Sequence, residues 1–214
     1  MPKDTFLNLP EEKRQLIENV AIDEFAEYGF EKASINRIVK AASIAKGSFY
    51  QYFEDKADLF LHIIAIVGEK KLEYVSPVMM NPSDYDFFTL LEELYRSGLA
   101  FARNHPTESK ISFEVFKNQN NPVFNAVIVE SRRSGLAFYE SLLEIGIERG
   151  EIDPEIDRSF ISQMLMQLQI SMLDYFLEAN DGESGMDDIL PTVQMMISLI
   201  KNGIQCQKLG ERSQ

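Results

Sequence analysis

Residues 34–53 read SINRIVKAASIAKGSFYQYF, and this stretch decides the fold. Ser34 can cap a first short helix, because the apolar residues that follow it recur at steps of three and four. A second short helix follows from Ala45 to Tyr52, after a turn of about four residues. Small apolar residues allow the first helix to cross the second closely, here Ala41, Ala42 and Ile44. The pattern predicts a helix-turn-helix.

Helical spacing continues on both sides of this stretch. A helix is predicted from Pro10 to Tyr28, with Gly29 ending it, and another from a cap at Asp55 until Pro77. No stretch of the sequence alternates as a strand would. Further helices are predicted for residues 84–103, 106–117, 121–149, 157–179 and 187–206.

The fold class that follows is all-α, with about nine helices. Residues 1–54 are predicted to form a three-helix domain that contains the helix-turn-helix. Residues 55–214 are predicted to form a larger C-terminal helical domain. The clearest break along the chain is PVMMNP, residues 77–82, which is typical of a turn.

The second helix of the motif carries side chains that suit contact with DNA. Lysine and glutamine reach base edges, small residues allow close approach to the groove, and hydroxyl groups donate to phosphate oxygens. Phe49 and Phe53 are expected to face inward. Taken singly, each tyrosine could be core and each lysine an ordinary surface residue, but their ordered context favours DNA contact. The candidates are Ser34, Lys46, Gly47, Ser48, Tyr50, Gln51, Tyr52 and Lys56.

The distribution of charge permits this interpretation without establishing it. The net charge is −13, and a strongly acidic surface is repelled by duplex DNA. Residues 61–214 carry 13 basic and 23 acidic side chains, so most of the negative charge lies there. Residues 32–56 carry five basic side chains against two acidic ones. An acidic body with one basic face suits a protein that binds DNA locally.

Four groups of residues support a more specific interpretation. They are YGF at 28–30, SINRI at 34–38, AKGSFYQYF at 45–53 and KADLF at 56–60. In this order and spacing, residues 10–62 resemble the TetR family of bacterial repressors. Two positions depart from the family pattern. Ser43 stands where glycine is usual, which costs free energy if its φ is positive, and Ala45 stands where serine or threonine usually caps the helix.

The resemblance implies a homodimer in which each third helix enters the major groove of a pseudo-palindromic operator. It also implies a small-molecule effector that enters the C-terminal domain, shifts the fourth helix and changes the separation of the two recognition helices. By position, Ser34, Tyr50 and Lys56 would contact phosphate, and Arg37 would add a phosphate contact. Tyr52 would lie at the groove wall. The residues near base edges would be Asn36, Lys46, Gly47, Ser48 and Gln51.

The C-terminal half offers candidates for the effector site and the dimer interface. Aromatic side chains that could line an effector cavity are Phe88, Tyr95, Phe113, Phe116, Phe124 and Phe138. Apolar stripes on the last two long helices could form a four-helix interface through Met164, Leu168, Met172, Met196 and Ile200. For both sets, ordinary packing within one chain remains the alternative.

Other classes of protein find little support in the sequence. The lone Cys206 fits a reducing compartment, and no signal peptide or membrane-spanning run of apolar residues is present, so a cytoplasmic location is expected. His62 and His105 lack a carboxylate or cysteine at catalytic or zinc spacing, so no enzyme, metal or cofactor is expected. The remaining alternative is an all-α adaptor that binds proteins and does not read DNA.

Overall fold

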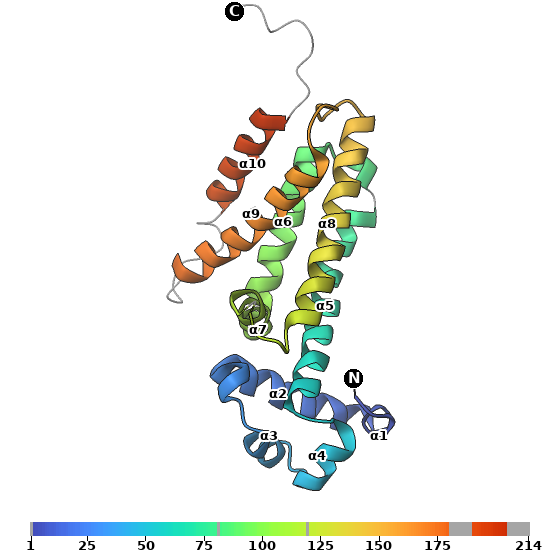
Figure 1. The fold of residues 1–214 in the computed structure, drawn as a ribbon, viewed down its shortest axis with the longest axis vertical. Helices are drawn as coiled ribbons and strands as arrows, with labels where there is room; N and C mark the ends of the chain where they lie inside the picture. Colours follow the sequence, from blue (N-terminus) through green and yellow to red (C-terminus); the bar gives the residue numbers. More distant parts are fainter. Residues whose placement is uncertain (1, 81, 119, 180–189, 205–214) are drawn as a thin grey trace, which may run out of the picture. The chain divides into compact units, whose positions relative to one another are not determined.

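The computed structural model describes residues 2–80, 82–118, 120–179 and 190–204, and it confirms the all-α prediction (Figure 1). No β-strand occurs within these ranges. The elements are α1 (Asp4–Leu7), α2 (Glu11–Lys32), α3 (Ile35–Ala41), α4 (Lys46–Tyr52), α5 (Lys56–Met80), the 3-10 helix η1 (Pro82–Asp84), α6 (Phe87–Asn104), α7 (Pro106–Lys117), α8 (Asn125–Glu148), α9 (Arg158–Ala179) and α10 (Leu190–Ile204).

Most helix boundaries lie close to those predicted, but two features differ. The prediction that Pro77 ends its helix is wrong, because α5 continues through Pro77 to Met80. Pro77 has no N–H to donate to the carbonyl of Glu73, so α5 lacks one hydrogen bond of its helical series three residues before it ends. The short helix α1 was not predicted, since four residues are too few to show a helical period. The predicted ends of the last helix, residues 187–189 and 205–206, lie outside the described residues, as does Cys206.

The chain forms two compact units, each assembled from two stretches of sequence. Unit 1 comprises residues 1–72 and 104–128, and unit 2 comprises residues 73–103 and 129–214. Helix α5 begins in unit 1 and its last turns belong to unit 2. Unit 1 therefore contains α1 to α4 together with α7, which comes from much later in the sequence.

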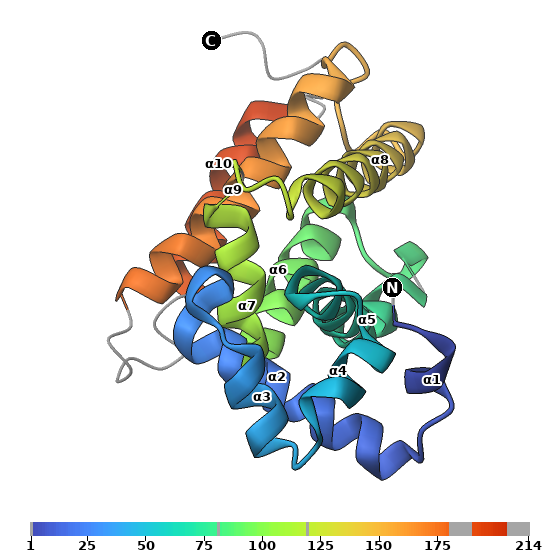
Figure 2. The same ribbon diagram turned by 60° about the horizontal axis from the view of Figure 1, so that its bottom comes forward.

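The core of unit 1 is aromatic. The rings of Phe25, Phe30, Phe60 and Phe124 lie against one another, with centroid separations between 4.9 and 6.5 Å. These rings come from α2, from α5 and from the segment just before α8. Helix α7 packs along α2, which can be followed in Figure 2. The core beneath the helix-turn-helix is thus completed by residues 104–128.

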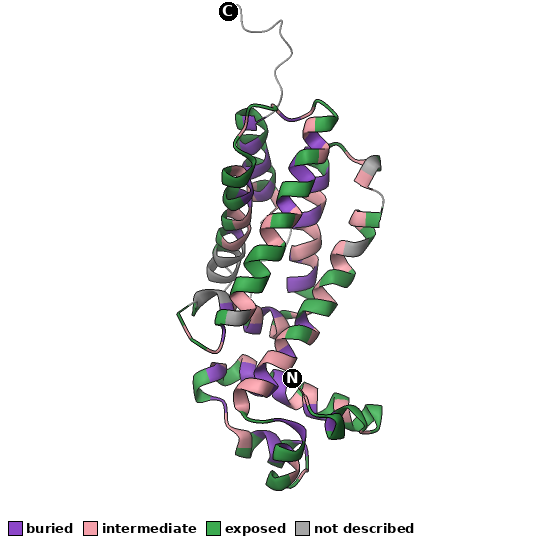
Figure 3. Cartoon of the chain, turned by 45° about the vertical axis from the view of Figure 1, so that its right-hand side comes forward, coloured by how far each residue is buried: buried purple, intermediate pink, exposed green. Residues whose placement is uncertain are grey.

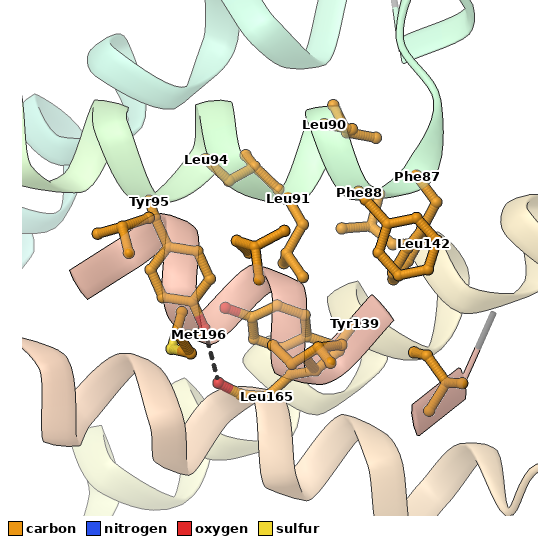
Figure 4. Close-up of a cluster of buried hydrophobic side chains, with 14 of the residues drawn as sticks. Phe87, Phe88, Leu90, Leu91, Leu94, Tyr95, Tyr139, Leu142, Leu165 and Met196 are labelled. Carbon is orange, nitrogen blue, oxygen red and sulfur yellow. Dashed lines mark hydrogen bonds between the residues drawn. The ribbon is translucent and has the colours of Figure 1, made fainter. Parts of the chain in front are cut away.

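The core of unit 2 is built mainly from α6, α8, α9 and α10 (Figure 4). Its polar groups include two buried tyrosines. The hydroxyl of Tyr95 donates to the carbonyl of Leu165 at 3.3 Å, and the hydroxyl of Tyr139 donates to Oε1 of Gln169 at 3.0 Å. Burial raises the pKa of both phenols well above the ordinary value, so both remain neutral hydrogen-bonding groups.

Helices in both units carry a buried stripe and an exposed stripe, as Figure 3 shows by colour. This is the pattern expected of amphipathic helices that pack on one face. None of the helices in the described part of the chain has a long enough apolar run to cross a bilayer.

Candidate nucleic-acid interface

The turn between α3 and α4 is held by backbone hydrogen bonds at the end of α3. The N–H of Ile44 donates to the carbonyl of Val39 at 3.0 Å, and the N–H of Ser43 donates to the carbonyl of Lys40 at 3.2 Å. This pair of bonds is a Schellman motif, which places the residue after the C-cap in the left-handed region. Ser43 occupies that position with φ of 52°. The chain thus forms a glycine-type turn with serine.

Helix α4 presents one exposed face and one buried face. Phe49 is fully buried, as predicted, and so is Phe53 just after the helix. On the exposed face, a Cβ at Gly47 would meet no atom within 4 Å, so a surface could approach the backbone closely there. Tyr50 is 45% exposed. The side chains and backbone brought together on this face belong to Lys46, Gly47, Tyr50 and Gln51, with Ser48 partly exposed at its edge.

The helix starts around the motif are capped differently from one another. The predicted cap at Asp55 is confirmed, because its carboxylate accepts the N–H of Asp58 at 2.8 Å. The predicted cap at Ser34 is wrong, since the side chain of Ser34 accepts no hydrogen bond from α3. The N–H of Ser34 instead donates to the carboxylate of Glu24 at 2.7 Å. Ala45 precedes α4 and provides no side-chain cap, because its methyl group cannot accept a hydrogen bond.

Glu24 fixes the start of α3 and was missed by the sequence analysis. Its carboxylate is buried, and it also accepts from the guanidinium of Arg37 with Nε at 2.8 Å. The guanidinium lies 4.0 Å from the ring centroid of Tyr28, and its Nη2 also donates to the carbonyl of Lys32. Arg37 is therefore a structural tie between α2 and α3, with 47% of its side chain still exposed. The signal that could have revealed this site is a charged residue in the apolar stripe of α2.

Lys56 makes a similar structural tie. Its Nζ donates to the backbone carbonyls of Glu31 at 3.0 Å and Ala33 at 3.1 Å, and it lies 4.8 Å from the ring centroid of Phe30. Two of its three donors are thus used to hold the segment between α2 and α3. One N–H remains for the phosphate contact that was predicted.

An N-terminal arm, residues 3–7, holds the C-terminal end of α4. Nζ of Lys3 donates to the carbonyl of Tyr50 at 3.0 Å, the N–H of Lys3 donates to the carbonyl of Tyr52 at 2.8 Å, and the hydroxyl of Thr5 donates to the carbonyl of Gln51. These three carbonyls lie in the last turn of α4, where no intrahelical donor is available. The arm therefore caps the helix that carries the candidate DNA contacts.

Phe6 anchors this arm in the core of unit 1. The side chain is fully buried, and its ring centroid lies 4.7 Å from that of Phe53 and 5.9 Å from that of Tyr52. Tyr52 itself is only 7% exposed, so the structure does not bring it to the exposed face of α4 with Tyr50. The predicted position of Tyr52 at a groove wall has no support from this burial.

The turn between α2 and α3 is held from outside the helix-turn-helix. Gly29 interrupts α2 with φ of 67°, as the predicted helix end at this glycine implied. The carboxylate of Glu114 in α7 accepts the N–H of Phe30 at 2.7 Å, and a Cβ at Gly29 would lie 2.8 Å from the same Oε1. Glycine is required here both for its backbone angle and for the close approach of Glu114.

Known proteins resemble this chain along almost its whole length. Residues 17–63 match the family model described as bacterial regulatory proteins, tetR family. The structure is similar to that of a TetR family transcriptional regulator from Chloroflexus aurantiacus, with a TM-score of 0.74 and 28% sequence identity over 97% of this chain and all of that one. The chain belongs to the TetR family of bacterial transcriptional regulators.

Curated relatives extend this TetR-family assignment beyond the helix-turn-helix. The chain is 25% identical to the HTH-type regulator YhgD of Bacillus subtilis over 76% of this chain and 83% of that protein. It is also 25% identical to the HTH-type repressor BepR of Brucella suis over 89% of this chain and 91% of that protein. Both halves of this TetR-family regulator therefore have counterparts in its relatives.

The aromatic candidates for the effector site are divided between the two units. Phe88 and Tyr95 are buried in the core of unit 2, and Phe138 packs against that core. Phe124 is 1% exposed in the core of unit 1, and Phe113 belongs to the same unit. The side chain of Phe116 lies outside the described residues. Which of these residues contact a ligand stays a prediction.

The residues predicted to form the dimer interface also have different environments. Met172, Met196 and Ile200 are buried in the core of unit 2, and Leu168 packs against that core. Met164 is 39% exposed. Among the side chains of α9 and α10 whose burial is described, the most exposed large apolar ones are others, namely Phe160, Tyr175, Met195 and Leu199.

The two histidines occupy ordinary structural environments. His62 has a carboxylate partner outside any catalytic or zinc spacing, because its Nε2 lies 2.9 Å from Oε1 of Glu18 in α2. This partner is distant in sequence, which is why spacing could not reveal it. Nδ1 of His105 lies 3.5 Å from Oε1 of Glu108. No group of three or more metal-ligating side chains occurs among the described residues.

Proposed function

We propose that this TetR-family regulator is a ligand-responsive repressor that binds a pseudo-palindromic operator as a homodimer. Residues 1–54 would be its DNA-binding domain and residues 55–214 its effector-binding and dimerisation domain. The observation that carries the proposal is the exposed face of α4, formed by Lys46, Gly47, Tyr50 and Gln51. A helix with these groups exposed and its aromatic face buried fits the major groove.

Contacts with the phosphate backbone would come from exposed groups around α3 and α4. Lys40 and Lys46 are exposed and form no ion pair with any described residue, so both are available to phosphates. The remaining predicted contacts are Ser34, Asn36, Arg37, Ser48, Tyr52 and Lys56. Of these, Asn36 and Arg37 are exposed, while Tyr52 is buried and would contribute through the packing of α4.

Selection of bound sequences from a random duplex pool would test DNA binding and its symmetry together. A palindrome with half-sites about 34–36 Å apart is expected if two recognition helices read successive major grooves. The variant carrying Lys46→Ala and Tyr50→Ala should bind the selected duplex more weakly, by about 1–3 kcal/mol for each side chain that touches DNA in the wild type. Lys110→Ala is the matched control, because Lys110 is an exposed lysine on α7.

Failure of the wild-type protein to bind any duplex at low ionic strength would refute the proposal. It would favour the alternative of an all-α adaptor, whose helix-turn-helix does not read DNA. Equal affinities for the wild type and the Lys46/Tyr50 variant would show that α4 is not the reading helix.

The dimer would form through the exposed apolar stripes of α9 and α10. Phe160, Met164 and Tyr175 share one face of α9, and they are 59%, 39% and 55% exposed. Met195 and Leu199 are 60% and 69% exposed one turn apart on α10. Exposed apolar stripes of this kind on neighbouring helices are typical of subunit interfaces.

Light scattering after gel filtration would test the dimer. The wild type should have twice the chain mass of 24.5 kDa. The variants Phe160→Glu and Leu199→Glu should shift towards a monomer, because each would bury a charge in the interface. Val129→Glu is the control, since Val129 is 61% exposed on α8. A wild-type monomer would refute this part of the proposal.

A small molecule is the proposed effector. The fold accommodates one in a FadR from Bacillus subtilis, which was solved in complex with stearoyl-CoA and has a TM-score of 0.72 to this chain at 21% identity. The proposed location is the cytoplasm, where an operator is accessible and where a lone cysteine stays reduced.

A further inference from the structure

The chain bends at Gly29 before it enters the helix-turn-helix. The φ of 67° and ψ of 166° at this residue lie outside the helical region, so the helical series of hydrogen bonds is interrupted here. A backbone N–H at such a break needs an acceptor from elsewhere. Helix α3 begins at Ile35, only a few residues further on. The conformation of this short segment therefore sets the direction in which α3, and after it α4, leaves α2.

Glu114 of α7 supplies the acceptor at this bend. Its Oε1 accepts the N–H of Phe30 at 2.7 Å, and the same oxygen would lie 2.8 Å from a Cβ at Gly29. The carboxylate thus lies directly against the backbone of the bend. Hydrogen bonds weaken steeply with distance, so a displacement of α7 by about 1 Å away from α2 would stretch this one beyond the usual range.

The segment that follows α7 contacts the next residue of the same bend. Nδ2 of Asn121 donates to Oε1 of Glu31 at 2.8 Å. The ring of Phe124 packs on the ring of Phe30, with centroids 5.4 Å apart. The stretch from α7 to the start of α8 therefore holds successive residues of the bend, through both polar and apolar contacts.

Apolar packing alone would hold α7 against α2, so the carboxylate needs a separate explanation. Burial raises the pKa of Glu114, which means that its charge is partly desolvated at a cost in free energy. Apolar contacts are not directional, whereas a hydrogen bond to a carboxylate orients the backbone N–H that donates it. The carboxylate is therefore suited to setting the geometry of the bend.

We propose that Glu114 is a positioning residue for DNA binding, which fixes the bend after Gly29 and so orients α3 and the exposed face of α4. It acts through the N–H of Phe30 and not through contact with DNA. The DNA affinity of α4 then depends on the position of α7, which belongs to the proposed effector-binding domain. This inference rests on the proposed reading of DNA by α4.

Three substitutions of Glu114 separate the reach of the carboxylate from its charge. Glu114→Gln removes the charge but keeps an oxygen at the same reach, so it should bind the selected duplex within about twofold of the wild type. Glu114→Asp keeps the charge but withdraws the oxygens by about 1.5 Å, and Glu114→Ala removes them. Both should lose about 10-fold in affinity, because the N–H of Phe30 loses its acceptor. A role that depended on charge would give the opposite order for glutamine and aspartate.

The affinity is measured by fluorescence anisotropy with the selected duplex, at a temperature where circular dichroism shows each variant to be folded. Asp23→Ala is the matched control, because Asp23 is an exposed acidic residue of α2 and its loss changes the net charge as Glu114→Ala does. It should bind within about twofold of the wild type. Urea unfolding of the same variants gives their stability. A purely structural role would lower the stability of Glu114→Asp without lowering the affinity of the folded protein.

Two results would overturn the positioning role. One is equal affinity of the wild type and Glu114→Asp, and the other is a loss with Glu114→Gln as large as the loss with Glu114→Asp. These two variants decide the matter even if Glu114→Ala fails to fold.

Failure of this role is distinguishable from failure of the proposed function. Wild-type protein that selects a palindromic duplex, with Glu114→Asp binding it equally well, would refute the positioning role and leave the repressor intact. Wild-type protein that selects no duplex would refute the repressor, and the positioning role with it.

Discussion

The N-terminal arm provides the most direct test of how the recognition helix is held, through the substitution Phe6→Ala. Phe6 is fully buried, and it is the only apolar residue of α1 with this property, since Leu7 is 49% exposed. Its ring lies against Phe53 at 4.7 Å and against His62 at 5.4 Å. Removing the ring should release the arm from the end of α4.

The magnitude follows from burial. Truncation of a fully buried phenylalanine to alanine costs about 3–5 kcal/mol. Part of the structure can relax by releasing only the arm, so about 3 kcal/mol is the expected loss of stability. Because domains of this size unfold with only about 5–15 kcal/mol, this loss is a large share of the total. Phe6→Leu retains most of the volume and should cost less than about 1.5 kcal/mol.

DNA affinity should fall together with stability. Once the arm is released, the carbonyls of Tyr50 and Gln51 lose the donors from Lys3 and Thr5, so the last turn of α4 frays. Urea unfolding followed by circular dichroism would give the free energy, and fluorescence anisotropy with a selected duplex would give the affinity. Leu7→Ala is the control and should change neither by more than about 0.5 kcal/mol. The reasoning is refuted if Phe6→Ala matches the wild type in both measurements.

Three further substitutions test the geometry around the motif. Ser43→Gly should raise the free energy of unfolding by about 0.5–1 kcal/mol, because glycine adopts the positive φ of this turn without strain; a lower melting temperature would contradict this. Glu24→Ala should lower the free energy of unfolding by about 1–3 kcal/mol, because the N–H of Ser34 and the guanidinium of Arg37 lose their acceptor. Glu24→Gln should lower the free energy of unfolding by a smaller amount. Burial raises the pKa of Glu114, so the folded state binds its proton more readily than the unfolded chain, and this group's contribution to stability falls as pH rises from about 4.5 through the raised value. Glu114→Gln should therefore gain stability relative to the wild type at pH 7 and lose that gain below pH 4.5 in urea unfolding; a difference independent of pH would contradict the assignment.

The helix-turn-helix could be predicted from the sequence because its signals are local. The apolar period, the small residues at the turn and the cap at Asp55 each depend on residues within about four positions. The predicted α7 matches its observed bounds, Pro106–Lys117, since a proline begins it and asparagines follow it. The limit of local reasoning appears at α1, where Thr5 and Phe6 make contacts almost fifty positions away in the sequence.

The roles of the charged and aromatic site residues could not be predicted in the same way. The resemblance assigned Arg37 and Lys56 to phosphate by their positions, but each has internal acceptors supplied by α2 and the segment after it. Tyr52 was placed at the groove wall by its position in the family pattern, whereas in the structure it is buried against the ring of Phe6. In each case the deciding partner belongs to another element, and only tertiary packing brings the two together.

These internal ties change how an acidic chain can bind DNA. Residues 32–56 carry five basic and two acidic side chains, and counting charges in this way assumes that every basic side chain is free to contact phosphate. Arg37 is neutralised by Glu24, and Lys56 spends two of its donors on carbonyl oxygens, so the fully available cations of α3 and α4 are Lys40 and Lys46. Few phosphate contacts leave more of the affinity to be supplied by base edges, close approach at Gly47 and the orientation of α4. The arm at one end of α4 and the Glu24–Arg37 tie at the start of α3 therefore matter more for binding than their distance from the groove would suggest.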